Sequence, residues 1–187
     1  MKNGIVKPTM GKLLISEPFM MDSYFQRSVV LLTEHGNEGT IGFILNKQTN
    51  VLVCDVLNGF PETDLPLYFG GPVQTDTIHF LHTLGASLEG SKEVMKGIYW
   101  GGNLEQLKYM VEKKMVSQND IKFFAGYSGW DPNQLKQELK HHTWLLYECS
   151  KKLAFIEDPQ KLWGTVLKTM GSDYAIMANF PVDPSLN

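Results

Sequence analysis

The sequence predicts a single compact α+β domain built on a large mixed, mostly antiparallel β-sheet flanked by helices. Short apolar and β-branched runs recur between turn residues along the chain, as expected of many strands. Three segments also carry helix-start signals. The 187 residues, of which 43% are hydrophobic and 20% charged, suit one well-packed domain. We take residues 1–187 as one domain, with its core at about 11–170, a C-terminal segment at 171–187 and a loose tail after Pro181.

Two runs near the N-terminus predict the first strands. Lys12–Ser16 is short and apolar, and Arg27–Thr33 is β-branched, with the length and continuity of a buried strand. The intervening segment, Glu17–Phe25, contains a proline and lacks a clear period. We expect it to form a connection that lays Phe19 and Phe25 on the core.

A β-hairpin and further strands follow. Glu34–Gly39 supplies the glycine and asparagine of a turn, and Thr40–Leu45 forms the returning strand, which ends at Asn46. Five later runs also predict strands, which makes the sheet large: residues 67–69, 77–82, 96–100, 121–125 and 143–147.

The first predicted helix begins at Asn103. Its side chain can cap backbone N–H groups that have no partner within the helix, and Gln106 follows three residues later. Lysines occupy the face opposite an apolar stripe with helical spacing, formed by Leu104, Leu107, Val111 and Met115.

Two more helices are predicted from Asp-Pro pairs. Asp131 and Asp158 are the expected caps, each followed by a proline in the first turn, where its missing N–H does no harm. Gly171 is well placed to end the later helix. The apolar stripes are Leu135 and Leu139 in the earlier helix, and Leu162, Trp163, Val166 and Met170 in the later one.

Composition narrows the functional classes. The net charge is −3 and Arg27 is the single arginine, so the chain lacks the basic resources of sequence-specific DNA readers. No run approaches the roughly 18 apolar residues of a membrane span, and Leu13–Ile15 is too short for a signal-peptide core. Cys54 and Cys149 are expected to be buried reduced thiols. We therefore expect a cytoplasmic protein that contacts neither membranes nor nucleic acid directly.

Known catalytic and cofactor signatures are absent from the sequence, and no cofactor is expected. The segment Gly126-Tyr-Ser-Gly-Trp130 superficially resembles a nucleophile elbow, but its second glycine directly follows Ser128 instead of lying two places beyond. A tight strand-to-helix turn is the better interpretation.

The histidines do not predict a metal site. His79 and His82 are three residues apart on a predicted strand, so their side chains point to opposite faces. His141 and His142 sit at the end of a predicted helix, where imidazolium is favoured by the helix dipole.

Several polar and glycine residues could have either a structural or a ligand-binding role. Arg27 at the start of a buried strand needs a partner, either Glu34 or another carboxylate, or else an anionic ligand. Asn46 can tie down a loop or recognise a polar ligand. Gly70 and Gly71 suit a sharp bend, or a backbone nest that binds an anion.

Several separated motifs together closely resemble the YqgE/AlgH family of bacterial proteins. They are Gly11-Lys-Leu-Leu-Ile-Ser16, Phe25-Gln-Arg-Ser-Val-Val30, Glu34-His35, Gly42-Phe-Ile-Leu-Asn46, Gly70-Gly-Pro-Val73 and Gly126-Tyr-Ser-Gly-Trp130. Order and spacing match from about Gly11 to Trp163, and Gln134-Leu-Lys-Gln-Glu138 with Trp144 extend the match. The resemblance implies a compact α+β domain with a large mixed sheet and supplies no established activity.

The chain departs from the family pattern at three places. Asp22-Ser23 stands where the family often has Asp-Pro, Asn46-Lys-Gln48 where it often has Asn-Arg-Pro or Asn-Lys-Pro, and Ser128 where alanine is frequent. The frequent alanine of family members at this position argues against Ser128 as a nucleophile. Some members are labelled transcriptional regulators, but this sequence lacks a helix-turn-helix signal.

We expect a non-catalytic cytoplasmic binding or regulatory module with a protein partner or a small anionic ligand. One alternative is an enzyme acting on a small anionic or nucleotide-like metabolite, with Arg27 and Asn46 for binding and Glu34 or His35 for proton transfer. DNA-linked regulation is a further alternative. The candidate binding residues are Arg27, Glu34, His35, Asn46, Gly70, Gly71, Tyr127 and Ser128.

Overall fold

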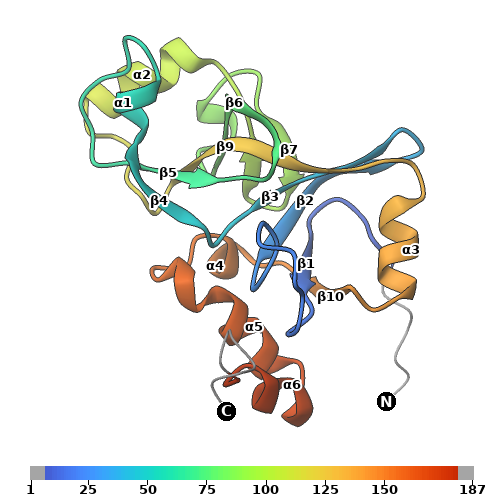
Figure 1. Ribbon diagram of the computed structural model, residues 1–187. Coiled ribbons are helices and arrows are strands. Elements are labelled where there is room, and N and C mark those ends of the chain that lie inside the picture. Colours follow the sequence, from blue (N-terminus) through green and yellow to red (C-terminus); the bar gives the residue numbers. More distant parts are fainter. Residues whose placement is uncertain (1–6, 181–187) are drawn as a thin grey trace.

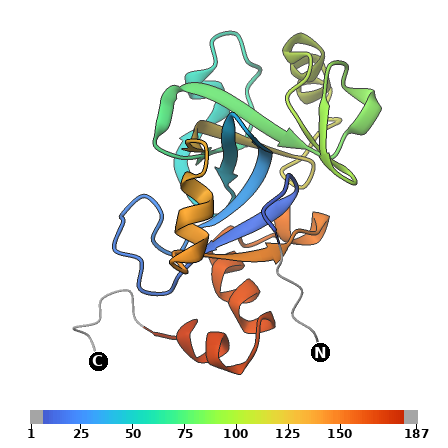
Figure 2. The ribbon, with the colours of Figure 1, turned by 90° about the vertical axis from the view of Figure 1, so that its right-hand side faces the viewer.

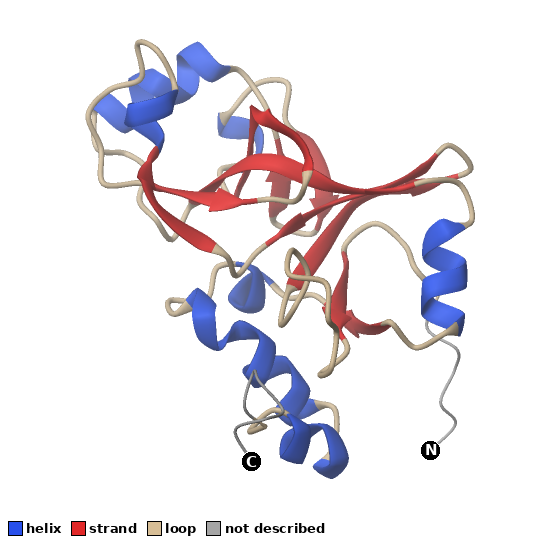
Figure 3. Cartoon of the chain, in the orientation of Figure 1, coloured by secondary structure: helices blue, strands red, loops and turns tan. Residues whose placement is uncertain are grey.

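The computed structural model describes residues 7–180 and has the predicted α+β architecture. A single sheet of ten strands fills the centre, and the helices lie around it (Figure 3). The strands are β1 (Lys12–Ser16), β2 (Val29–Gly36), β3 (Gly39–Ile44), β4 (Gln48–Leu52), β5 (Pro66–Phe69), β6 (Val73–His82), β7 (Lys92–Met95), β8 (Ile98–Trp100), β9 (Ile121–Trp130) and β10 (Trp144–Glu148).

The sheet is mixed but mostly antiparallel, as predicted. Its main path runs β10-β1-β2-β3-β9-β6-β8-β7, and every neighbouring pair on that path is antiparallel. The antiparallel pair β4 and β5 joins through β5, which runs parallel to the first half of β9. The long strand β9 therefore connects the two halves of the sheet (Figure 1).

The helices occupy three places around the sheet (Figure 1). Helices α1 and α2 lie at one end, α4 to α6 lie along β1 and β10, and α3 stands beside the β2–β3 hairpin. Their bounds are α1 (Val53–Val56), α2 (Leu104–Glu112), α3 (Gln134–Lys140), α4 (Lys151–Ala154), α5 (Leu162–Thr169) and α6 (Ser172–Met177), with short 3₁₀ turns at Gly85–Ser87 and Pro159–Lys161.

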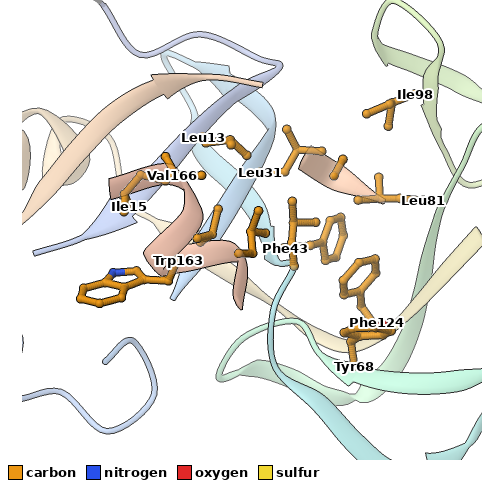
Figure 4. Packing of buried hydrophobic residues seen from close by; sticks show 14 of the residues in the cluster. Leu13, Ile15, Leu31, Phe43, Tyr68, Leu81, Ile98, Phe124, Trp163 and Val166 are labelled. Carbon is orange, nitrogen blue, oxygen red and sulfur yellow. The ribbon is translucent and has the colours of Figure 1, made fainter. Parts of the chain in front are cut away.

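The first strands are continuously apolar because both of their faces are buried. Leu13 and Leu14 point to opposite faces of β1, and neither is exposed to solvent. On one face, Leu13, Leu31 and Phe43 pack with Trp163 and other residues of α5 (Figure 4).

The opposite face of these strands is covered by α3. In the turned view, α3 lies in front of the N-terminal strands (Figure 2). Leu14, Val30 and Ile44 from the sheet share a cluster with Leu135 of α3 and Trp144 of β10. A third cluster, between β9 and α2, forms the core of the other half.

The interpretation of residues 126–130 as a strand-to-helix turn is wrong. These residues continue β9, pairing Tyr127 with Val73 and Ser128 with Gly42. Gly126 has φ +64°, and the register with β6 shifts next to it, which is typical of a bulge. A glycine that bends a strand and one that ends it look alike in sequence.

Helix starts are only partly as predicted. The Asn103 side chain caps α2 by accepting a hydrogen bond from the Gln106 N–H at 3.0 Å, as expected. Asp131 does not cap α3, which begins at Gln134 after Asn133 in a left-handed conformation (φ +68°). The Asp131 carbonyl instead accepts the Gln134 N–H at 3.0 Å, and this turn delays the helix.

The C-terminal segment also differs from expectation. Asp158 is followed by a 3₁₀ turn and then α5, and its carboxylate pairs with Lys161 at 2.8 Å without capping the helix. The helix ends before Gly171 as predicted, but the unpredicted α6 follows immediately. The expected tail after Pro181 lies outside the described residues.

One strand was missed, and three smaller predictions need correction. Strand β4 was missed, and the predicted strand 96–100 is the end of a hairpin that turns at Gly97 (φ +80°) between β7 and β8. Phe19 does not lie on the core, because it is 52% exposed. Cys54 and Cys149 are free thiols, as expected, but each is only half-buried.

Candidate functional site: a groove beside helix α3

A cavity of about 920 Å³ lies between α3, the tip of the β2–β3 hairpin and β10. We call it the α3 groove. Its apolar lining consists mainly of Leu135, Leu139, Trp144 and Leu146, and its polar lining includes Lys7, His35, Thr40, Asp131, Lys136, Lys140 and His142.

The groove forms because α3 covers its sheet face incompletely. Leu135 and Leu139 are four residues apart and so share one side of the helix. Leu135 is buried, whereas Leu139 and its counterpart on β10, Leu146, are only partly buried. The cavity beside these leucines leaves apolar area open to a ligand.

His35 lines the groove from the β2–β3 hairpin. It pairs with Thr40 across the hairpin, and its Nδ1 lies 2.7 Å from the Thr40 hydroxyl oxygen. This contact orients the imidazole while leaving Nε2 without a hydrogen-bond partner among the described residues. His35 can therefore offer a nitrogen to a ligand.

The rim of the groove is predominantly basic. Lys7, Lys136 and Lys140 line it, together with His142, whereas Asp131 is the one acidic side chain among the described lining residues. None of the three lysines forms an ion pair with a described residue. The groove thus combines an apolar wall with unpaired positive charge.

On its other side, α3 is held by a carboxylate between two tryptophans. Trp130 and Trp144 each donate an indole N–H to Oε2 of Glu138 at 2.8 Å, and Gln134 donates to Oε1 at 2.9 Å. Phe25 packs edge-on against Trp144, with ring centroids 5.4 Å apart. We call Trp130, Gln134, Glu138 and Trp144 the Glu138 clamp.

The clamp fixes the width of the groove. It joins the end of β9, the middle of α3 and the start of β10, and a smaller cavity of about 260 Å³ borders it. Hydrogen bonds to an ionised acceptor are among the stronger ones in proteins. The helix is therefore anchored at a defined distance from the sheet.

Asn46 lies away from the groove and ties two backbone segments together. Its side-chain oxygen accepts the Val29 N–H, and its amide donates to the Arg27 carbonyl, both at 2.8 Å. The side chain is almost completely buried. Both ends of the amide are therefore occupied by the turn that precedes β2.

Arg27 is not paired with Glu34, and that expectation is wrong. The guanidinium lies over the Trp163 ring, 5.0 Å from its centroid, and donates to the Phe180 carbonyl, while its Nε is buried without a partner. Glu34 instead pairs with Lys92 at 2.5 Å. No carboxylate among residues 7–180 forms an ion pair with Arg27.

Gly70 and Gly71 allow the chain to pass very close to β9. A Cβ on Gly71 would lie 2.3 Å from the Tyr127 carbonyl carbon, and one on Gly70 would lie 2.2 Å from the Gly126 oxygen. Ser128 is buried and donates its hydroxyl to the Gly70 carbonyl at 3.0 Å. These residues form a packed strand junction.

Tyr127 lies on the opposite side of β9 from Ser128. Its ring is perpendicular to His79, with centroids 5.9 Å apart, and it packs against the cluster that contains Phe43. Of the eight candidate residues, His35 alone lines the α3 groove. Arg27, Asn46, Gly70 and Ser128 gather around the ends of β2, β3 and β5 instead.

The groove and the clamp were missed as a site. The sequence signal for this site was membership in the motifs that carry the family resemblance, which include Gln134, Glu138, Trp130 and Trp144. Their meeting depends on how β9, α3 and β10 fold back on one another. No spacing rule for a single helix or strand reveals that contact.

Lys122 is a second polar feature outside the groove. It is 3% exposed on β9, donates to the Leu45 carbonyl at 3.2 Å and lies over the Tyr68 ring at 4.7 Å. Burial lowers its pKa to about 8. No ion pair among the described residues compensates this ammonium group.

The two histidines of β6 have separate surroundings. His79 packs against Phe43, whereas buried His82 accepts the Leu84 N–H at Nδ1 and places Nε2 2.9 Å from the Gly101 carbonyl. Desolvation lowers the pKa of both rings. Because the His82 Nε2 must carry its proton to bond that carbonyl, it is not positioned as a base for the nearby Ser91 hydroxyl.

Residues 7–180 contain neither a candidate metal cluster nor a helix suited to crossing a membrane. No group of three or more histidine, cysteine, aspartate or glutamate side chains there could hold a metal ion. None of the helices in that part of the chain combines the length and the hydropathy needed to cross a bilayer.

Comparison with known proteins finds similar chains over nearly the whole length. A sequence profile described as AlgH-like matches residues 13–175. The chain is 42% identical over 177 residues to a UPF0301 protein of Chlorobaculum parvum, covering 95% of both chains. It is 41% identical over 180 residues to a UPF0301 protein of Cytophaga hutchinsonii, covering 96% of this chain and 99% of the other.

Two solved structures share the fold. The crystal structure of protein DIP2367 from Corynebacterium diphtheriae has a TM-score of 0.79 at 23% identity, covering 96% of this chain and 95% of that one. The solution structure of the AlgH protein from Pseudomonas aeruginosa has a TM-score of 0.74 at 24% identity, covering 97% and 98%. None of these names states a reaction.

Proposed function

Because the chain belongs to the YqgE/AlgH family, whose name specifies no reaction, we propose that it is a non-catalytic cytoplasmic binding module that holds a ligand in the α3 groove. The observation that carries the proposal is the open apolar wall of that groove, formed by Leu139 and Leu146 under a basic rim. Small-molecule sites in proteins commonly combine such a wall with a few polar groups.

The volume of the groove supports this proposal. A cavity of about 920 Å³ lies within the usual range for ligand sites, which is roughly 300–1,000 Å³. The Glu138 clamp holds α3 in place before any ligand arrives. Binding then requires little ordering of the protein, which favours affinity.

The enzymatic alternative has less geometric support. It requires Arg27 and Asn46 to bind a metabolite next to Glu34 or His35, but Arg27 packs on Trp163 while Glu34 pairs with Lys92. His35 reaches the α3 groove without a carboxylate partner. A single imidazole can bind a ligand, whereas general acid–base catalysis usually needs a second positioned group.

Direct DNA binding is also not favoured. The single arginine lies over Trp163, away from the groove, and the net charge is −3. Affinity for nucleic acid would have to come from a phosphate-neutralising surface. We therefore propose a small molecule as the occupant of the groove.

The test is a thermal-shift screen against metabolites, including nucleotides and organic acids, with a variant whose groove is filled. A ligand at 100 times its dissociation constant stabilises by about 2.7 kcal/mol, which raises the melting temperature by several degrees. Leu146→Trp should abolish the shift because the indole occupies the open apolar wall.

The matched control is Leu104→Trp, which alters a half-buried leucine of α2 in the other half of the molecule. It should leave the shift intact. A ligand whose shift survives Leu146→Trp binds elsewhere and refutes the proposal, as does a screen without any hit.

A further inference from the structure

We propose that the ligand of the α3 groove is an amphipathic anion, with an apolar chain along the helix and one negatively charged end group. This inference rests on the proposed function, because it names the ligand class of the same groove. It is drawn from the arrangement of apolar and charged side chains along α3.

The apolar chain has a defined place. Leu135 and Leu139 lie one helical turn apart on the side of α3 that faces the sheet, and Leu146 faces them from β10. Trp144 closes the bottom of this wall and is itself held by Glu138. A linear hydrocarbon lying along α3 would cover the accessible parts of the partly buried Leu139 and Leu146, which water contacts in the free protein.

Positive side chains lie along α3 beside the apolar wall. Lys136 and Lys140 are also one turn apart, in the row next to the two leucines, and His142 follows the helix. Asp131, the acidic residue in the lining, lies before the start of α3. The end group is therefore expected between Lys136 and Lys140, whose side chains are the closely spaced cations of the groove lining.

Helix stability explains the two lysines only in part, because the helix dipole favours a cation at Lys140 in the last turn of α3. Like charges four residues apart on a helix repel each other. Five lysines form ion pairs among the described residues, whereas Lys136 and Lys140, like the exposed Lys151 and Lys152 of α4, have no carboxylate partner there. An anion bound between them would remove the repulsion, and this charge complementarity selects an anionic occupant over a neutral one.

The test compares three probes that share one apolar chain: decanoate, 1-decanol and decyltrimethylammonium. The two ionic probes are titrated below their micellar concentrations and 1-decanol below its solubility limit. Binding is followed by calorimetry and by tryptophan emission, because Trp144 lines the groove. Decanoate should bind at least about tenfold more tightly than either of the other two probes, which corresponds to about 1.4 kcal/mol. Its affinity should also fall with added salt.

Two variants test which side chains bind the charged end and which bind the apolar chain of the ligand. Lys136→Gln combined with Lys140→Gln should weaken decanoate by about tenfold and leave decanol unchanged. Leu146→Trp should remove binding of all three probes. The matched control changes two exposed lysines of α4, Lys151→Gln with Lys152→Gln, and should alter nothing.

The outcomes separate the two proposals. If all three probes bind equally well and Leu146→Trp removes them, the groove is a binding site but the anion inference is wrong. If no probe binds while a metabolite from the broader screen does so in a Leu146-dependent manner, the amphipathic class is wrong. If the protein dimerises in a Leu146-dependent manner and the probes do not bind, the occupant is a second copy and both proposals fail.

Discussion

Replacing Lys122 with methionine is expected to stabilise the protein near neutral pH by about 2 kcal/mol. Burial lowers the pKa of Lys122 from 10.5 to about 8. Because one pKa unit corresponds to about 1.4 kcal/mol, holding the ammonium inside the fold costs roughly 3 kcal/mol at pH 7. Methionine fills similar space without charge, but it leaves the Leu45 carbonyl without this donor, which offsets about 1 kcal/mol.

The pH dependence identifies the cause. Below pH 8 the amine is protonated in both the folded and the unfolded chain, so the whole cost is present. Between about pH 8 and 10.5 the folded protein loses this proton before the unfolded chain does. The contribution of Lys122 to the free energy of unfolding therefore becomes less unfavourable as the pH rises. The advantage of Lys122→Met over the parent should therefore be constant below pH 8 and shrink towards pH 10.5.

The assay is urea unfolding followed by tryptophan fluorescence at several pH values from 7 to about 10. Comparing variant with parent cancels the groups they share, including the Cys149 thiol, whose pKa burial raises to about 12. Lys96→Met, at an exposed turn, is the control and should change stability by less than about 0.5 kcal/mol. A destabilised Lys122→Met protein, or an advantage that does not vary with pH, would refute the reasoning.

Three further changes test the clamp and the strand junctions. Glu138→Ala removes the acceptor of two indole N–H groups and should lower the free energy of unfolding in urea by about 2–3 kcal/mol. Glu138→Gln should lower it less, and equal losses in the two variants would contradict a role for the charge. Asn46→Ala leaves a buried N–H and a carbonyl unpaired and should cost about 2 kcal/mol in thermal unfolding, whereas an unchanged midpoint would show that water replaces the amide. Gly71→Ala should lower the stability measured by circular dichroism melting by more than about 3 kcal/mol, because the added methyl group would lie 2.3 Å from the β9 backbone. A melting curve like that of the parent would mean that the strands can separate there.

Strands buried on both faces could be predicted from sequence, whereas exposed ones could not. The runs that form β1 and β2 are continuously apolar because α5 packs on one face and α3 on the other. Strand β4 is mostly exposed and begins Gln48-Thr-Asn, so it carries no such signal. Its place depends on pairing with β5.

Turn residues were harder to interpret because their meaning depends on distant partners. Gly126 bends β9 without ending it, since β6 and β3 continue to pair with the strand beyond the bulge. Asp131 has the sequence of a helix cap, but a turn through Asn133 shifts the start of α3. Both errors concern where an element begins or ends.

The candidate site was the least predictable part. His35 could be named from sequence as a polar residue at a hairpin, and it does reach the groove. The groove itself is the space left between α3 and the sheet, and its width is set by Glu138 contacting Trp130 and Trp144. No pattern of residues in the sequence predicts a space of this kind between two elements.

The central position of β9 has a consequence for synthesis on the ribosome. Strand β3 pairs with β2 early, but its other neighbour ends only at Trp130, and β1 must await β10. At about 5–20 residues per second, translation from Ile44 to Trp130 takes roughly 4–17 seconds. During that interval the apolar N-terminal hairpin has an unpaired edge and no helix cover, so the nascent chain is a natural client for chaperones that shield such segments.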